Sequence, residues 1–302
     1  MASAYRITIE TWTVVGEGAI GLLAAARLSQ AGYPLQLHRR CAGAFDFLFK
    51  SGQHQSSISA PAQLQLPYSY VLLPVKAFAV LDAFKQLLPL LAEDAQLVLS
   101  HNGMGTIEQL LPLLKPKQGL WFLTTSHGAF KADERTVIHS GLGQSVLGPL
   151  NQAALLQQQQ VEHAMQAALG PLQMTTDILP ALWQKLAVNA VINPLTALHQ
   201  CKNGELSLPH YSAAIGLLLQ EFVQVATASG QDFSLDAIQS RVIQVINQTA
   251  ENYSSMQQDF AKGRRSELDY ITGFLLRQAE QYQLQLPAHQ ALYQLLLQKS
   301  PR

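Results

Sequence analysis

Two groups of residues in this sequence have the types and spacing that chemistry requires. Lys185, Asn189 and Asn193 recur every four residues within a stretch that is otherwise apolar, ALWQKLAVNAVINPLTAL at 181–198. On a helix these three side chains share one face. Burying them costs free energy unless each has a partner. The line is therefore an internal network, a face toward solvent or a strip that binds substrate, and the last is favoured. A lysine in a partly buried cleft has a lowered pKa, which makes it a usable proton donor near neutral pH.

The second group is a glycine-rich turn, GEGAIG at 16–21. A short apolar strand precedes it and a helix rich in Ala and Leu follows, which is the context expected of a dinucleotide-binding fingerprint. Gly16 permits the turn, Gly18 lets a pyrophosphate approach the backbone, and Gly21 lets helix and strand pack closely. The unpaired N–H groups of a helix start suit that anion. The alternative, a glycine turn that binds nothing, is less favoured in this context.

The end of the next strand selects the dinucleotide. Gly32 is expected to cap the first helix, and the following extended residues end at His38-Arg39-Arg40. An NAD site carries Asp or Glu near this position for the ribose hydroxyls, and this chain has none there. Guanidinium groups suit a 2′-phosphate, so NADP(H) is favoured over a solvated basic turn.

Two further polar residues follow predicted strands. Lys76 comes just after a strand at 68–73, and Asn102 begins the loop after a strand at 95–100. Ligands bind at the carboxyl ends of strands in open α/β sheets, so both side chains are candidates for contact with cofactor or substrate. A solvated lysine and an Asn-Gly turn chosen only for positive φ are the plain alternatives.

Composition bounds the class of protein. The 302 residues are 48% hydrophobic and 13% charged, and 20 basic side chains balance 20 acidic ones. This favours a globule with a large core and gives no electrostatic footprint for nucleic acid. Cys41 and Cys201 make no metal or disulfide pattern. With no signal core and no membrane-spanning run, a soluble, cytoplasmic protein is expected.

The order of elements predicts two domains. Strands and helices alternate at first, which indicates a Rossmann-type, doubly wound α/β domain at 1–174. Helix then follows helix, so 175–302 is expected to be an all-helical domain that carries substrate and catalytic residues. A ligand cleft is expected where the two meet.

Several segments are harder to interpret. Residues 41–67 are interrupted by Gly, Ser, Gln and Pro, which predicts a long irregular connection with at most one edge strand. Two short extended pieces, 136–140 and 144–147, are expected to add antiparallel strands to the sheet. Residues 250–256 are placed late in a long helix. Ser266 is then an N-cap, and Glu267 a first-turn acid favoured by the helix dipole.

Several motifs, in order, resemble the ketopantoate reductases (2-dehydropantoate 2-reductases), with a close match to enterobacterial members. Beyond the glycine turn they are HNGMGT at 101–106, KLAVNAVINPLTAL at 185–198, NGEL at 203–206, AENYSSM at 250–256 and SELDYITGF at 266–274. The resemblance covers nearly the whole chain. It implies an oxidoreductase that reduces ketopantoate to pantoate with NADPH, in the pathway to pantothenate and coenzyme A.

The resemblance also implies roles for individual residues. Lys185 is implied as the proton donor, and Glu267 as the acid that supports it and contacts the cofactor. The implied cofactor-binding residues are Gly16, Glu17, Gly18, Ala19, Ile20, Gly21, Arg40, Lys76, Asn102, Ala129 and Glu267. Those implied to bind substrate are Asn102, Lys185, Asn189, Asn193, Asn203 and Ser255. No metal is implied.

The sequence leaves two other functions open. The chain could be an NADP-sensing module without turnover, although a sensor has no need of both Lys185 and Glu267. It could also reduce another 2-keto acid. The expected partner is a small-molecule substrate, with no nucleic acid and no membrane, and the protein is a monomer or a homodimer. The segment 1–9 and the poorly matching region 41–67 are given no role.

Overall fold

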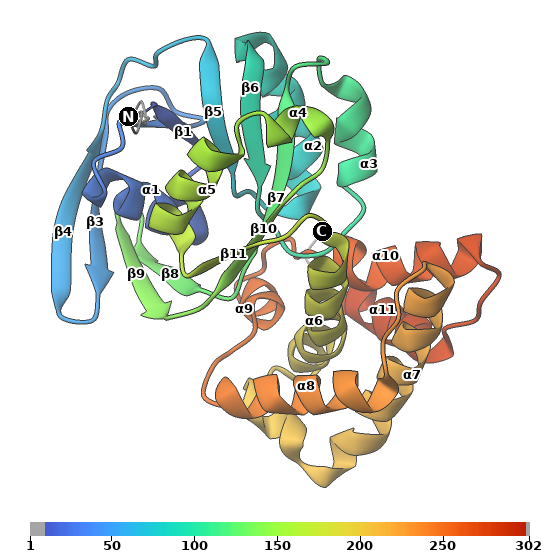
Figure 1. The fold of residues 1–302 in the computed structure, drawn as a ribbon. Coiled ribbons are helices and arrows are strands. Elements are labelled where there is room, and N and C mark those ends of the chain that lie inside the picture. The colour runs from blue at the N-terminus through green and yellow to red at the C-terminus, as the bar shows by residue number, and fades with distance from the viewer. Residues whose placement is uncertain (1–9, 300–302) are drawn as a thin grey trace, which may run out of the picture. The chain divides into compact units, whose positions relative to one another are not determined.

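The structure, a computed structural model, describes residues 10–299, and the segment 1–9 lies outside this range. The chain folds into two compact units (Figure 1). The first runs to His101 and resumes over Thr106–Ile178. The second holds Leu179 onward together with the short loop Asn102–Gly105. This loop follows a strand of the first unit but packs with the helices of the second.

A seven-stranded sheet forms the centre of the first unit, in the order β11-β10-β7-β6-β5-β1-β2. The neighbours from β2 to β7 are parallel, and β10 runs antiparallel to β7. The strands are β1 (Trp12–Val15), β2 (Leu35–His38), β5 (Tyr68–Leu73), β6 (Leu91–Leu99), β7 (Gly119–Thr125), β10 (Ser145–Pro149) and β11 (Leu172–Met174). The chain leaves β1 in one direction to reach β2 and lies on its other side at β5. The crevice for a ligand is therefore expected between the carboxyl ends of β1 and β5.

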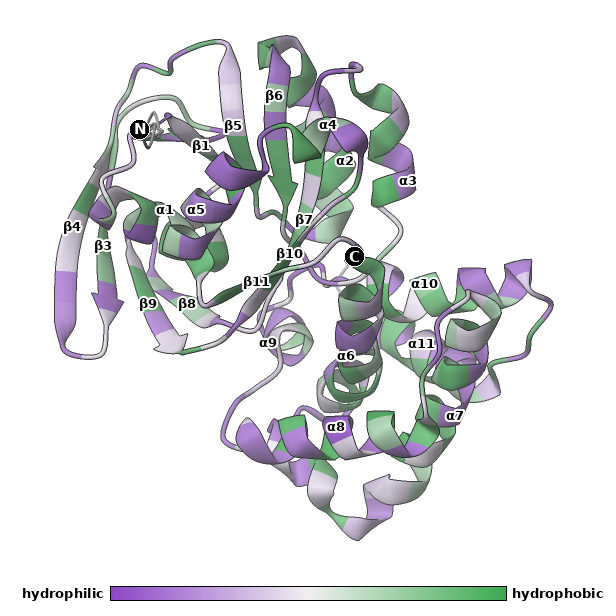
Figure 2. Cartoon of the chain, viewed as in Figure 1, coloured by the Kyte–Doolittle hydropathy of each residue, from purple (hydrophilic) through white to green (hydrophobic). Residues whose placement is uncertain are grey.

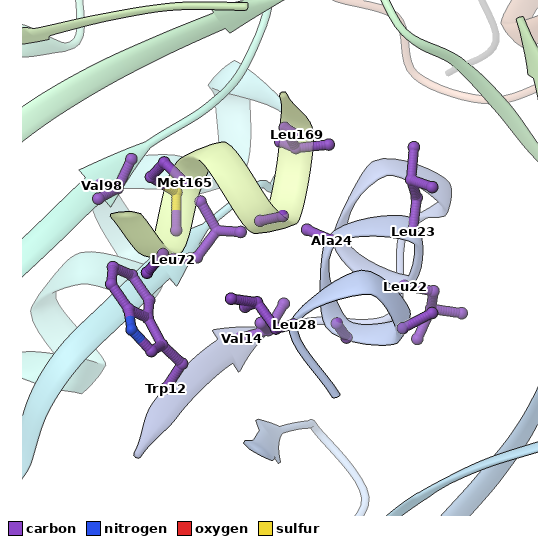
Figure 3. Packing of buried hydrophobic residues seen from close by; sticks show 14 of the residues in the cluster. Trp12, Val14, Leu22, Leu23, Ala24, Leu28, Leu72, Val98, Met165 and Leu169 are labelled. Atoms are coloured by element: carbon purple, nitrogen blue, oxygen red, sulfur yellow. The ribbon is translucent and has the colours of Figure 1, made fainter. Parts of the chain in front are cut away.

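Helices lie on both faces of the sheet. The chain crosses from β1 to β2 and from β5 to β6 in opposite directions, and right-handed crossovers in opposite directions place α1 and α2 on opposite faces. The helices of this unit are α1 (Ala19–Gln30), α2 (Ala77–Leu87), α3 (Ile107–Leu110), α4 (Gln152–Leu155) and α5 (Gln158–Leu169), with 3-10 turns η1 (Leu88–Leu90) and η2 (Leu111–Leu113). Helix α1 packs beside α5 (Figure 1). Leu22 and Leu28 of α1, Trp12 of β1 and Met165 of α5 meet in one hydrophobic cluster (Figure 3).

The predicted end of α1 is confirmed. Gly32 has φ +86°. Its N–H donates to the carbonyl of Ser29 at 3.0 Å, and the N–H of Tyr33 donates to that of Leu28 at 3.0 Å. This pair of bonds is a Schellman motif, which satisfies carbonyls that the helix end would otherwise leave open.

The expectation of an irregular connection at 41–67 is wrong. Strands β3 (Phe45–Ser51) and β4 (His54–Ala60) form an antiparallel hairpin in a second sheet of order β4-β3-β9-β8, with β8 (Gly128–Asp133) and β9 (Thr136–Gly141). The piece at 136–140 thus joins this second sheet, and only 145–149 adds to the first. Strand β3 alternates buried phenylalanines with other residues. Strand β4 resembles a loop in sequence because only Ile58 and Ala60 of its seven residues are buried.

Helix α6 (Leu179–His199) is the core of the second unit and packs against α7 (Ser212–Ala228), α8 (Leu235–Gln248), α9 (Ser255–Ala261), α10 (Leu268–Gln281) and α11 (Pro287–Lys299). Two 3-10 turns, η3 (Asn203–Ser207) and η4 (Pro209–Tyr211), precede α7. The predicted burial of α6 is confirmed, since most of its residues are inaccessible. Helix α8 instead shows hydrophilic and hydrophobic bands along its length, as a helix covering a core does (Figure 2).

Residues 250–256 do not lie late in a long helix, and that prediction is wrong. Helix α8 ends at Gln248, and a new helix starts after Ser254. The Ser254 hydroxyl accepts the N–H of Gln257 at 3.1 Å, which is an N-cap bond. The break contains no Gly or Pro, so the sequence signalled it only through this serine. Within residues 10–299, no helix combines the length and the apolar character needed to cross a membrane.

Candidate active site

The glycine turn lies directly after β1 and is shaped to receive an anion. Gly16 has φ +84°, a conformation that favours glycine. Gly18 is the exposed N-cap residue of α1, and Ala19 begins the helix. No side chain caps this end and the first turn carries no acid. The first-turn amides are therefore available to a phosphate, and the dipole of α1 favours its charge.

The close packing expected at the third glycine of the turn is present in the structure, and it involves Pro74 as well as the strand before the turn. A Cβ on Gly21 would lie 2.9 Å from Cγ of Pro74 and 3.5 Å from Cγ1 of Val14. Pro74 directly follows β5, so Gly21 is needed for the approach of two neighbouring strand ends to α1. Lys76 is the half-buried N-cap residue of α2. It therefore stands at the end of the strand beside the glycine turn, where the sequence predicted it.

The two arginines after β2 are in different situations. Arg39 pairs with Glu17 of the glycine turn at 3.4 Å, and its guanidinium lies 4.0 Å from the centroid of the Phe45 ring. Its position is thus fixed by an acid and by a cation–π contact. Arg40 is exposed. Of the pair, Arg40 is the one whose side chain is accessible to a new anion.

The structure places Ala129 in the second sheet. It is a half-buried residue of β8 and pairs with His139 of β9. Ile20 and Ala19 lie in the first turn of α1, partly buried against the hydrophobic cluster. The residues implied for the cofactor thus come from the ends of β1, β2 and β5 and from the second sheet, all within the first unit, except Asn102 and Glu267.

The polar line of α6 carries a lysine with an unusual pKa. Lys185 and Asn189 are half-buried and Asn193 is buried. Burial lowers the pKa of Lys185 to about 8, and the nearby Glu267 carboxylate raises it against that effect. Desolvation therefore outweighs the attraction of the acid. A lysine with this pKa exchanges a proton readily near neutral pH.

Glu267 is more than a first-turn acid, and Ser266 is not the N-cap that the sequence predicted. Glu267 itself is the N-cap residue of α10, and its side chain makes no cap bond. It is buried, with 3% of its surface exposed. One carboxylate oxygen, Oε2, accepts the amide N–H of Asn102 at 3.2 Å. The carboxylate is thus directed to Asn102 and Lys185 rather than to its own helix.

The loop that carries Asn102 is fastened to the start of α10. The N–H of Met104 donates to the carbonyl of Tyr270 at 2.8 Å. Gly103 has φ +79°, and a Cβ at this position would collide with the backbone of Tyr270. The Asn-Gly pair is therefore more than a turn chosen for positive φ, because the glycine permits the close approach to Tyr270 and the asparagine contacts Glu267. Contact of Asn102 with cofactor or substrate stays a prediction.

The remaining substrate candidates lie in neighbouring parts of the second unit. Asn203 is buried at the start of η3. Ser255 is exposed and begins α9, which packs on α6. Thr196 is a further polar residue here, one that no sequence motif singled out. Its hydroxyl on α6 lies 2.7 Å from that of Ser254, the N-cap residue of α9. Only its place three residues after Asn193, on the same helix face, could have suggested it.

A doubly wound sheet with a glycine turn, followed by helices that hold a lysine beside a buried acid, defines a class of two-domain oxidoreductases. Comparison with protein families makes the assignment specific. The model "Ketopantoate reductase PanE/ApbA" matches residues 12–152, and "Ketopantoate reductase PanE/ApbA C terminal" matches 177–300. The chain belongs to the ketopantoate reductase family.

Curated relatives and solved structures agree with this assignment. The chain is 37% identical to the 2-dehydropantoate 2-reductase of Vibrio cholerae over 93% of its own length and 95% of the relative's. It is 35% identical to the 2-dehydropantoate 2-reductase of Yersinia pestis over 95% of its own length and 94% of the relative's. The solved structure of a probable 2-dehydropantoate 2-reductase from Bacillus subtilis has a TM-score of 0.81 at 28% identity, covering 96% of this chain and all of the other. A D-mandelate dehydrogenase solved with NADH has a TM-score of 0.86 at 19% identity, which shows the shared fold.

Replacing Gly103 tests the fastening of the Asn102 loop. Gly103→Ala is expected to lower the free energy of unfolding by about 3 kcal/mol, because the methyl group meets the Tyr270 backbone and φ is strained. The matched control is Gly230→Ala. Gly230 has the same φ, +79°, but nothing within 4 Å of its Cβ position. Urea unfolding of both variants measures the difference, and equal losses would contradict the close packing described here.

Proposed function

We propose that this protein is a cytoplasmic reductase that converts 2-dehydropantoate to pantoate with NADPH, in the biosynthesis of pantothenate and coenzyme A. Relatives that are 33–37% identical to this chain match it over nearly their whole length, and they are named 2-dehydropantoate 2-reductase. The observation that carries the chemistry is Lys185, whose pKa burial lowers to about 8 beside the Glu267 carboxylate.

The residues of the first unit fit a dinucleotide. The uncapped first turn of α1 suits the pyrophosphate, and the exposed Gly18 leaves room for it. Arg40 supports the choice of NADPH because it is exposed at the end of β2, where an NAD site carries an acid. Arg39 neutralises Glu17, the one acid in the turn, which removes a repulsion against the phosphates. Bound NADPH supplies the hydride.

Lys185 acts as the proton donor. Reduction of the keto group places negative charge on its oxygen, and the ammonium of Lys185 stabilises that charge and then transfers a proton to it. Glu267 favours the charged form of the lysine, so that burial does not strip the proton at neutral pH. Asn102 donates to Glu267 and thereby holds the carboxylate in place.

The asparagines orient the keto acid. Asn189 and Asn193 continue the line of Lys185 along α6, and amide groups offer both donors and acceptors to a carboxylate or a keto oxygen. Ser255 adds a hydroxyl from the first turn of α9. Fixing the substrate in this way lowers the entropic part of the barrier.

Removing the amine tests the proposed acid. Lys185→Ala is expected to lower kcat with 2-dehydropantoate and NADPH by about 10²- to 10⁴-fold, the usual contribution of a positioned acid. Lys262→Ala, at an exposed position of the same unit, serves as the control and should keep the wild-type rate. The wild-type rate should fall as pH rises through about 8, because the ammonium is then lost. An unchanged kcat in Lys185→Ala, followed by NADPH absorbance, would remove Lys185 from this role.

Replacing Arg40 tests the choice of cofactor. Arg40→Ala is expected to raise the KM for NADPH by about 10- to 100-fold, the value of one charge-assisted hydrogen bond, and to leave the KM for NADH unchanged. Arg241→Ala, which removes an exposed arginine of the helical unit, is the matched control. Steady-state kinetics with both cofactors give the ratio. A variant that keeps the wild-type preference for NADPH would exclude Arg40 as the residue that recognises the 2′-phosphate.

A further inference from the structure

Asn203 and Thr249 form a hydrogen-bonded pair whose direction the structure determines. The hydroxyl of Thr249 donates to the carbonyl of Val245 at 2.7 Å. Because a hydroxyl has a single proton, the same oxygen can only accept from Asn203. The contact of 2.9 Å between these two side chains is therefore made by the amide nitrogen of Asn203. This reasoning fixes which end of the Asn203 amide is nitrogen and which is oxygen.

The backbone around Asn203 is held as firmly as the side chain. Its N–H donates to the carbonyl of Asn252 at 2.9 Å, and the N–H of Gly204 donates to that of Ala250 at 3.1 Å. A Cβ on Gly204 would lie 2.7 Å from the Cβ of Ala250, so η3 and the turn after α8 are in close contact. Rotation of the amide is thus the main freedom left to Asn203, and Thr249 removes it.

The fixed orientation leaves the oxygen of Asn203 in an unusual state. This oxygen, Oδ1, is buried and has no hydrogen-bond partner among residues 10–299. A buried acceptor without a partner is costly, and native proteins contain few of them. An amide flip would not relieve the cost, because it would set oxygen against the acceptor oxygen of Thr249. The missing partner is therefore a hydrogen-bond donor.

We propose that Thr249 is a positioning residue that presents the oxygen of Asn203 to the substrate, and that this oxygen selects 2-keto acids bearing a hydroxyl group. The inference rests on the proposed function, in which Asn203 binds the keto acid. The carboxylate and the keto oxygen of such a substrate can only accept hydrogen bonds. A hydroxyl can donate, and 2-dehydropantoate carries one on its terminal carbon. Thr249 acts through Asn203 and needs no contact with the substrate.

A comparison of two keto acids tests this selection. 2-Dehydropantoate and 3,3-dimethyl-2-oxobutanoate differ only in the hydroxyl, so their kcat/KM ratio with NADPH measures how it is recognised. A site built to bind a hydroxyl rejects the analogue that lacks it, by about 10⁴-fold where the acceptor is left unpaired. The wild-type ratio is expected to be about 10²-fold or more.

The decisive variant is Thr249→Val, which keeps the shape of the side chain and removes the hydroxyl. In this variant the side-chain amide of Asn203 is free to rotate. The kcat/KM ratio of the two keto acids is therefore expected to fall at least 10-fold, through a higher KM for 2-dehydropantoate and an unchanged rate with the deoxy analogue. Thr249→Ser keeps the hydroxyl and should retain the wild-type ratio. Thr249→Ala gives the same measurement if the valine variant does not fold.

The outcomes separate this inference from the function on which it rests. A wild-type ratio in Thr249→Val would overturn the proposal, and so would an equal loss with both keto acids, since that indicates a merely structural threonine. If the wild-type protein reduces neither keto acid, the proposed function itself fails. If it reduces both equally well, the function stands and the selection by the hydroxyl fails.

Discussion

The burial of one ammonium group is the constraint on which the rest of this molecule depends. Lys185 lies on a helix whose other faces are packed into the core, and burial lowers its pKa to about 8. Without an opposing charge the amine would lose its proton more readily, and the proposed proton donor would become a neutral base. Glu267 supplies that charge from the start of α10. The pair is poised between the two effects, which suits proton transfer near neutral pH.

A balance of this kind needs rigid surroundings, and small residues provide them. Gly103 lets the loop approach Tyr270 closely, so that Asn102 can donate to Glu267. Gly204 plays the same part for Asn203, by allowing η3 to contact Ala250. In both places a glycine brings backbones together and the neighbouring asparagine carries the polar contact. Polar groups held in this way are ordered before any substrate arrives, which lowers the entropic cost of binding.

The parts of the fold that sequence predicts are those in which a local pattern has a single interpretation. The glycine turn, the Gly32 cap and the buried helix around Lys185 follow from spacing and burial alone. The hairpin at 45–60 was missed because the pairing of β4 with β3 comes from backbone bonds, which leave no apolar pattern in HQSSISA. Local pattern alone also places Glu267 one residue too far into its helix, although the resemblance implies its role beside Lys185. The capping sequence fits Ser266, whereas the helix begins at Leu268 and makes Glu267 the N-cap residue. The contact of its carboxylate with Asn102 is tertiary and leaves no local pattern.

A titration of the Lys185 amine by NMR, with the side chain assigned by comparison with Lys185→Arg, tests whether burial and the Glu267 carboxylate together set its pKa. We expect a pKa of about 8 in the wild-type protein, and a lower one in Glu267→Gln, because the carboxylate that raises it is gone. A pKa near the ordinary lysine value of about 10.4, unchanged by loss of the acid, would contradict it.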